Sequence, residues 1–434
     1  MSLALVGVIG ILVLLFVLFF VGMPVGFAMA IVGFAGYCYV LNFKAGLGML
    51  STELWMTFSK YGLTVIPLFI LMGQIAFYSG VNRKLYDAAY KWVGQIRGGI
   101  AMATVMACAA FSAICGSNAA TAATMTTVAL PEMKKFRYEP MLSTGAIACG
   151  STLGVVIPPS VVLIVIGLYT GQSIGKLFYG GVAAGILLAI LLTVTVYVVC
   201  TFRPGWGPVG EKTTFSEKLR ALPGAVEMLI LFLLVMLGLY YGFFTPAEAG
   251  AAGSFFALVI SVVQRGLSWQ GFINSIMDTL RISCMVIMIV AGATIFGKFL
   301  TVTRIPFNIA EWVTGLPVPD FLIMGIILLI FVIGGAVMDA LALLLITIPI
   351  FFPVAEGMGH DPIWFSVTIT VVTTLGAVTP PVGATTYVVG GMAKDVPLES
   401  VFKGVAFFLP AYILCIILLM VFPGIVTFLP NLIR

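Results

Sequence analysis

The chain has 434 residues, of which 61% are hydrophobic and only 9% are charged, and its formal net charge is +5. Apolar runs of about 20 residues, long enough to cross a bilayer as a helix, recur from one end to the other. The small basic excess is spread over short loops, which argues against nucleic acid as a partner. The composition predicts an all-α polytopic membrane protein that is surrounded by lipid.

The first apolar stretch has no charge before Lys44. Because a cleavable signal peptide starts with a basic region, we expect this stretch to be a retained span. The seven cysteines are scattered through apolar segments without a CxxC pair, which favours packing residues. No HExxH, GxSxG or Walker-type motif occurs, so the sequence does not indicate an enzyme.

Residues 98–131 form an apolar stretch that is too long for one span and is interrupted by Gly-Ser-Asn near its middle. The connections on either side, 80–99 and 131–140, carry more basic than acidic residues and should be cytoplasmic. If both ends lie on one side, the stretch must enter the membrane and return. We therefore predict a re-entrant helical hairpin over about 98–131, with Ser117 and Asn118 at its tip.

The next stretch contains GSTLGVVIPPS at residues 150–160. Two consecutive prolines remove two backbone donors and disrupt the preceding turn, and lipid cannot satisfy the freed backbone groups. The break must therefore face protein, water or an ion. We predict a Pro-Pro-broken helix over about 140–170, with Gly154, Pro158 and Ser160 around the break.

The same pattern returns 222 positions later, so that Pro158-Pro159 falls on Pro380-Pro381. Two halves are therefore built on one plan. The predicted boundaries are 1–211 for the first half, 222–434 for the second, and 201–224 for a polar linker between them. Internal repeats in a membrane protein point to a transporter.

The second half predicts a hairpin over about 321–353, with Asp339 at its tip, and a broken helix over about 363–392. Around the second break lie Gly376, Thr379, Pro380, Gly383 and Thr385. The connections of this half, about 298–320 and 355–362, lack the basic excess and fit the outside, whereas the linker fits the cytoplasm. The two repeats are therefore predicted to be inverted, with both termini outside.

A broken helix exposes carbonyl groups at the end of its first part and N–H groups at the start of its second. The carbonyls suit Na⁺, and the N–H groups suit a carboxylate. Asp339 is the most informative residue, because a carboxylate inside an apolar run costs roughly 2.5–3.5 kcal/mol on insertion scales unless it finds a partner. The alternative is that Asp339, Ser117 and Asn118 only cap helices. Glu248 is expected to be structural and His360 to be solvated.

Four segments together carry a resemblance to a known family. They read GGIAMATVMACAAFSAICGSNAATAATMTTVALPEM, GSTLGVVIPPSVVLIVIGLYTGQSIGKLFYGG, GAVMDALALLLITIPIFFPV and GAVTPPVG. The chain resembles the large membrane subunit of tripartite ATP-independent periplasmic (TRAP) transporters over essentially its whole length. The resemblance implies an elevator-type, Na⁺-coupled importer of an organic acid in the bacterial inner membrane. It also implies two partners, a small four-helix membrane subunit and a periplasmic binding protein that delivers the acid.

The resemblance further implies ion and substrate sites at the hairpin tips and the broken helices. One Na⁺ would lie at Ser117, Asn118 and Gly154, and another at Asp339, Gly376 and Thr379, so that two or more ions couple transport. The substrate would contact Ser117, Asn118, Pro158, Ser160, Pro380, Gly383 and Thr385.

Two other functions stay open, an autonomous Na⁺/dicarboxylate symporter that binds free substrate and a gated channel. The sequence does not name the acid, since C4-dicarboxylates, sialic acid, other sugar acids and keto acids all fit. If the hairpins and broken helices form a rigid carrying unit, the remaining spans form its scaffold. Those spans are about 1–41, 177–200, 224–264 and 405–429.

Overall fold

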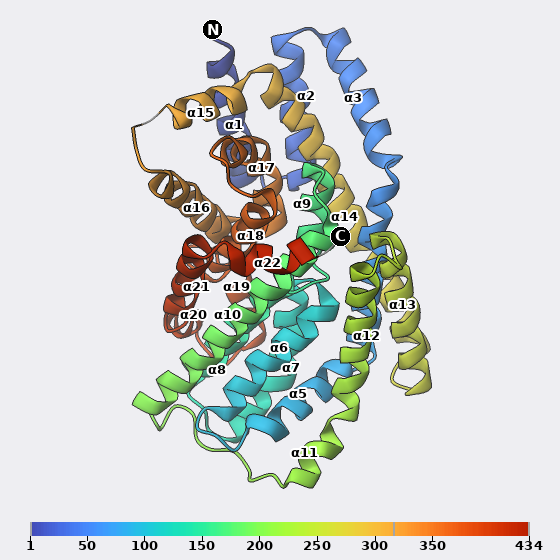
Figure 1. The fold of residues 1–434 in the computed structure, drawn as a ribbon, viewed down its shortest axis with the longest axis vertical. Helices are drawn as coiled ribbons and strands as arrows, with labels where there is room; N and C mark the ends of the chain where they lie inside the picture. The colour runs from blue at the N-terminus through green and yellow to red at the C-terminus, as the bar shows by residue number, and fades with distance from the viewer. Residues whose placement is uncertain (1, 316, 433–434) are drawn as a thin grey trace.

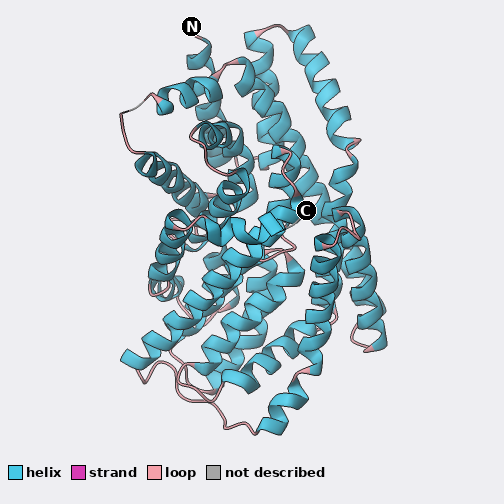
Figure 2. Ribbon diagram, viewed as in Figure 1, coloured by secondary structure: helices cyan, strands magenta, loops and turns pink. Residues whose placement is uncertain are grey.

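The computed structural model describes residues 2–315 and 317–432, and these residues form helices joined by short connections, without a strand (Figure 2). Within them, seven helices are long and apolar enough to cross a membrane, or up to nine if each of two bent helix pairs is one span. The predicted all-α polytopic fold is confirmed. Residue 316, in the predicted 298–320 connection, and residues 1, 433 and 434, at the ends of the two predicted halves, lie outside the described residues.

The helices of the first half follow one another with short connections (Figure 1). In order they are α1 (Leu3–Phe16), α2 (Val25–Val40), α3 (Phe43–Phe58), α4 (Val65–Tyr78), α5 (Val81–Val93), α6 (Gly99–Cys115), α7 (Asn118–Lys135), α8 (Pro140–Ser151), α9 (Val161–Thr170) and α10 (Ile174–Phe202). A π-helical segment, Val17–Val21, continues α1, and 3-10 turns precede α4 (Tyr61–Thr64) and follow α8 (Thr152–Val155).

The linker contains one short helix, α11 (Phe215–Ala221), which begins with a capping box between Thr214 and Glu217. The helices that follow are α12 (Pro223–Tyr240), α13 (Pro246–Val263), α14 (Trp269–Val302), α15 (Ile305–Thr314), α16 (Asp320–Val337), α17 (Ala340–Gly357), α18 (Pro362–Val378), α19 (Ala384–Met392), α20 (Leu398–Ala406), α21 (Leu409–Val421) and α22 (Gly424–Leu432).

Several helix boundaries recur at the spacing of 222 residues found in the sequence. Helices α7 and α17 begin at residues 118 and 340 and end at 135 and 357. Both Pro-Pro bonds, Pro158-Pro159 and Pro380-Pro381, are cis. Each hairpin continues four residues past the predicted end, because Pro131 and Pro353 lie inside helices rather than at their ends.

The helices pack in two groups (Figure 1). In the wall group, α2 and α4 pack on the long helix α14, α3 packs on α2 and α14, and α13 packs on α4 and α12. In the hairpin group, α6 packs on α7 and α8, α16 on α17 and α18, and α20 on α8. Helix α10 packs on α6, α18, α21 and α22, and α21 on α18. The predicted scaffold spans 177–200 and 405–429 correspond to α10 and α21, which pack on the hairpins and broken helices, so their place in a scaffold stays a prediction.

The linker packs on both basic connections of the first half. The Gly98 N–H donates to the Gly207 carbonyl at 2.9 Å, and the Glu139 N–H donates to the Trp206 carbonyl at 3.0 Å. Helices α11 and α5 lie together at the lower end of the molecule in Figure 1. The linker and the open end of the first hairpin therefore share one end of the molecule.

Candidate functional site

The first hairpin turns at Gly116 and Ser117, between α6 and α7. Gly116 has a φ of +64°, a left-handed conformation that glycine adopts without strain. Ser117 caps α7, since its Oγ accepts the Ala120 N–H at 3.5 Å. Asn118 follows, and its buried Oδ1 has no hydrogen-bond partner among the described residues. Because buried polar atoms are nearly always paired, this amide oxygen indicates a site for a cation or a donor.

The broken helix of the same half lies directly against this tip. A Cβ added to Gly154 would lie 2.7 Å from the Ser117 carbonyl oxygen, and a Cβ on Gly116 would lie 2.6 Å from the Pro159 carbonyl oxygen. Ser160 caps α9 by accepting the Leu163 N–H at 3.3 Å and donates to the Val155 carbonyl at 2.6 Å. The tip and the break therefore meet backbone to backbone.

The second hairpin turns at Met338 and Asp339, between α16 and α17. Asp339 caps α17, since its Oδ2 accepts the Leu341 N–H at 3.0 Å. The side chain also lines a cavity of about 820 Å³ between α17 and the wall helices α2 and α14. Other residues around this cavity are mostly apolar, among them Pro24, Met285 and Met288. The carboxylate is thus exposed at the boundary between the hairpin group and the wall group.

The second broken helix contacts its own hairpin in the same way. A Cβ on Gly376 would lie 2.6 Å from the Gly335 carbonyl carbon. The N–H groups of Val382 and Gly383 both donate to the Ala336 carbonyl, at 3.0 and 3.1 Å. Thr379 ends α18 and donates to the Gly376 carbonyl at 3.0 Å.

The two halves meet around these breaks. Helix α19, from the second break, packs on α7 and α8, and α9, from the first break, packs on α17 and α18. The hairpin tips and both breaks therefore belong to one helix cluster, as Figure 1 shows at mid-height. Such irregular backbone within membrane-crossing helices is tolerated where it is buried in protein or lines a cavity.

Comparison with known proteins identifies the family of this chain. The family "Tripartite ATP-independent periplasmic transporter, DctM component" matches residues 12–425. The chain belongs to this family. As a TRAP large permease it is a multi-pass protein of the inner membrane and a transport protein rather than an enzyme.

Individual relatives agree with the family. The chain is 32% identical to the C4-dicarboxylate TRAP transporter large permease protein DctM of Pseudomonas aeruginosa, over 92% of this chain and 93% of that protein. It is 30% identical to the sialic acid TRAP transporter large permease protein SiaM of Vibrio cholerae, over 96% of each. It is 34% identical to the isethionate TRAP transporter permease protein DctMQ of Oleidesulfovibrio alaskensis, over 77% of this chain and 53% of that protein.

A solved structure shares the fold. The crystal structure of the YdaH transporter of Alcanivorax borkumensis superposes with a TM-score of 0.60, over 88% of this chain and 89% of that one, at 15% sequence identity. At that identity the likeness concerns the arrangement of helices alone.

The predicted site residues of the TRAP large permease fall into three sets. The first-half set Ser117, Asn118 and Gly154 is in direct contact. In the second half, Gly376 and Thr379 lie together, and the atoms nearest to a Cβ on Gly376 belong to the backbone of Gly335 and Val332. The remaining residues lie around the breaks: Pro158 beside Gly181 of α10, Ser160 as the cap of α9, Pro380 in the second break, Gly383 before α19, and Thr385 buried in α19.

Two residues outside the predicted site behave differently from each other. Glu248 forms a capping box with Thr245 at the start of α13, which is a structural role, as expected. His360 was predicted to be solvated, and this was wrong. Its ring stacks on Trp364 at 4.9 Å, and its Nε2 is buried without a hydrogen-bond partner in the described part of the chain.

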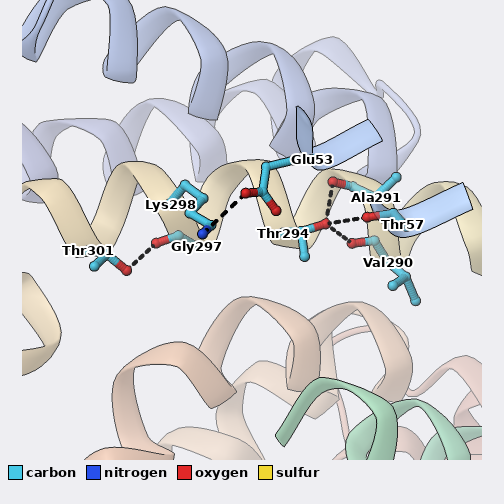
Figure 3. A network of polar contacts seen from close by, with 8 residues as sticks. All are labelled: Glu53, Thr57, Val290, Ala291, Thr294, Gly297, Lys298 and Thr301. Atoms are coloured by element: carbon cyan, nitrogen blue, oxygen red, sulfur yellow. Dashed lines mark hydrogen bonds and ion pairs between the residues drawn. The ribbon is translucent and has the colours of Figure 1, made fainter. Parts of the chain in front are cut away.

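A polar network between α3 and α14 was not found from the sequence (Figure 3). Lys298 and Glu53 form an ion pair at 3.1 Å, and the hydroxyl oxygens of Thr57 and Thr294 lie 3.3 Å apart. Lys298 was predicted to lie in the 298–320 connection, but it lies inside α14. The available signal was Glu53, an isolated acid between two apolar stretches.

Proposed function

We propose that this TRAP large permease imports an organic acid together with Na⁺ by an elevator movement of the hairpin group against the wall group. The observation that carries the proposal is the paired geometry of the two halves. In each half, the backbone of a hairpin end touches the glycine of a broken helix, Gly154 in one and Gly376 in the other.

The first Na⁺ site of the proposal consists of Ser117, Asn118 and Gly154. The free Oδ1 of Asn118 and the carbonyl oxygen of Ser117 are oxygen ligands of the kind that an alkali cation binds. The second site consists of Asp339, Gly376 and Thr379, where a carboxylate supplies negative charge. Two or more ions would then drive each cycle.

The substrate of the proposal is an anion held by N-terminal helix ends. Helices α7, α9 and α19 all begin at the hairpin tip or the breaks, and the positive N-terminal ends of their helix dipoles favour negative charge. The residues assigned to this contact are Ser117, Asn118, Pro158, Ser160, Pro380, Gly383 and Thr385. The relatives named for C4-dicarboxylate, sialic acid and isethionate all concern organic anions, which supports this substrate class.

An ion pair between the halves supports the inverted repeat. Lys134 lies at the open end of the first hairpin and pairs with Asp395, just after α19. If the repeats ran parallel, α19 would end on the same side as α9, which is the side opposite the open end of the first hairpin. The Lys134–Asp395 contact fits inverted halves instead.

The partners of the proposal are a small membrane subunit and a periplasmic binding protein that delivers the acid. The test is uptake into liposomes under an inward Na⁺ gradient. This chain alone should take up little free acid, and uptake should appear when the small subunit and the loaded binding protein are both added. Strong uptake by the single chain would replace this proposal with an autonomous Na⁺/dicarboxylate symporter, and non-saturable flux would indicate a channel.

A further inference from the structure

A second cavity, with more polar side chains in its lining than the cavity at Asp339, lies between the wall group and the hairpin group, away from the hairpin tips. It has a volume of about 730 Å³, which is within the usual range for small-molecule sites. We call six of its polar lining residues the wall site: Glu53, Thr57, Lys60, Tyr169, Thr294 and Lys298. Ser59 and Thr301 also line the cavity. Helices α3 and α14 supply most of these residues, and α9 supplies Tyr169.

The charges of the wall site do not cancel. Lys298 pairs with Glu53, whose side chain is only 12% exposed. Lys60 forms no ion pair with any carboxylate in the described residues, and its Nζ donates only to the Leu168 carbonyl, at 2.7 Å. The wall site therefore keeps one positive charge, on the exposed Lys60, that no carboxylate of the described residues neutralises.

Several hydroxyl groups line the same cavity as Lys60. Thr57 and Thr294 face each other across α3 and α14, as Figure 3 shows. The Tyr169 hydroxyl approaches the backbone of α14 so closely that a Cβ on Gly297 would lie 2.6 Å from it. A lysine with several hydroxyls matches a small hydroxylated or dicarboxylic anion better than it matches an apolar chain.

The wall site is separate from the hairpin tips. Leu168 lies eight residues along α9 from Ser160, and Pro349, which also lines the cavity, lies ten residues along α17 from Asp339. At 1.5 Å per residue these separations are about 12 and 15 Å. Both lead away from the breaks toward the helix ends that the proposed topology places outside.

We propose that the wall site binds the carboxylate of an organic acid through Lys60, as a first stop before the hairpin tips. The inference rests on the proposed function for its ligand class. Lys60 then exchanges the Leu168 carbonyl for the carboxylate, while the Lys298–Glu53 pair stays neutral.

The test measures thiol labelling of the full chain in nanodiscs of neutral lipid, without any Na⁺ gradient. Ser59→Cys places a thiol in the cavity lining beside Lys60, in a background where the accessible Cys38 and Cys284 are replaced by serine. An anionic sulfonatoethyl methanethiosulfonate should react about threefold or more faster than its cationic trimethylammonium analogue. Lys60→Gln should abolish this preference, and Lys60→Arg should restore it.

The matched control is Lys44→Gln, an exposed lysine in the first turn of α3 that lies outside the cavity, and it should leave the preference unchanged. Succinate, N-acetylneuraminate or isethionate should slow the labelling of Ser59→Cys, whereas glucose should not. Equal rates for both reagents, a preference that survives Lys60→Gln, or no protection by any of the three acids would overturn the wall site. Protection that requires anionic lipid in the disc would assign the site to a lipid headgroup instead.

The labelling needs no transport, so it separates the two proposals. If uptake fails while labelling behaves as expected, the wall site stands and the proposed function falls. If uptake is Na⁺-dependent, Lys60→Gln should raise the KM for delivered acid severalfold with little change in kcat. An unchanged KM would contradict a role in substrate capture.

Discussion

Ser117 and Asp339 occupy corresponding positions 222 residues apart, and each caps the second helix of a hairpin. If these two residues only capped helices, any residue with a good capping side chain would serve equally well at either position. The two positions differ in chemistry, because one carries a hydroxyl followed by an unpaired amide oxygen and the other carries a carboxylate. The proposed ion sites depend on this difference, and so do the changes that test them.

Asp339→Asn keeps the capping group but removes the charge. We expect it to raise the Na⁺ concentration for half-maximal uptake about tenfold, which corresponds to about 1.4 kcal/mol. The matched control is Asp361→Asn at the cap of α18, where Asp361 accepts the Trp364 N–H at 2.8 Å, and it should leave Na⁺ dependence unchanged. Equal effects of the two changes on Na⁺ dependence would show that Asp339 acts only as a helix cap.

His360 predicts a pH dependence in the loop between α17 and α18. Burial lowers the pKa of His360 below its ordinary value of 6.5, while Asp320 opposes the shift. The unfolded chain therefore takes up the proton first as the pH falls below about 6.5, so this residue lowers stability at acidic pH. His360→Gln should flatten the fall in melting temperature between pH 7.5 and pH 5. An unchanged slope would contradict the assignment.

Sequence reasoning reached the residues whose signals are local. Ser117 and Asn118 interrupt an apolar run, and Asp339 is a charge within one. The Lys298–Glu53 pair was missed because its members are 245 residues apart and meet only when α3 packs on α14. His360 was misjudged although Trp364 is only four residues away, because the stacking of the two rings depends on where α18 begins.

At the scale of elements, the close approach of hairpin and broken helix in each half requires glycine. A Cβ at position 154 or 376 would lie within 2.7 Å of backbone atoms in the facing segment. Backbone cannot move aside as a flexible side chain can, so each hairpin would shift. The glycines hold the proposed ion ligands at their present spacing.

Gly154→Ala and Gly376→Ala should each destabilise the fold by about 1–3 kcal/mol and reduce Na⁺-dependent uptake. Gly325→Ala is the matched control, because Gly325 lies inside α16 with no atom near its added Cβ. Melting temperature and uptake measured together separate the two effects. Wild-type uptake in both variants would show that the contact has no part in transport.

The observed helix ends show where the local sequence pattern no longer suffices to predict a helix boundary. The Pro-Pro breaks were found because two missing donors cannot be hidden in lipid. Pro131 and Pro353 were taken as helix ends, yet α7 and α17 continue past them to Lys135 and Gly357. A single proline within a packed helix loses one hydrogen bond, which neighbouring helices can offset. Packing therefore decides the boundary.

At the scale of the whole molecule, the chain's repeat does not by itself say which helices move. Helices α10 and α21 were expected to join the scaffold, but they pack on the hairpin group. Their faces are apolar on several sides, so hydropathy gives no preference between partners. Glycines such as Gly181 decide which helices α10 packs on, because the absence of a side chain lets α10 approach the Val156 carbonyl beside the first break.

Accessibility tests the inverted arrangement. Lys135→Cys, at the end of α7, and Lys394→Cys, beside Asp395, should be labelled only from the cytoplasm, because the Lys134–Asp395 pair brings these segments together. Glu356→Cys should be labelled only from outside, although residue 356 corresponds to residue 134 in the repeat. In the protein used for this labelling, Cys38 and Cys284 are again replaced by serine. Labelling of all three from one side would contradict inversion.

The most direct test of the account compares driving gradients in liposomes that contain this chain and the small subunit, with loaded binding protein outside. An inward Na⁺ gradient should drive uptake that rises with Na⁺ more steeply than a single site allows, because two ion sites must fill. A proton gradient without Na⁺ should drive none. Uptake that proceeds equally well without Na⁺ would contradict the assignment of the hairpin tips and broken helices as coupling-ion sites.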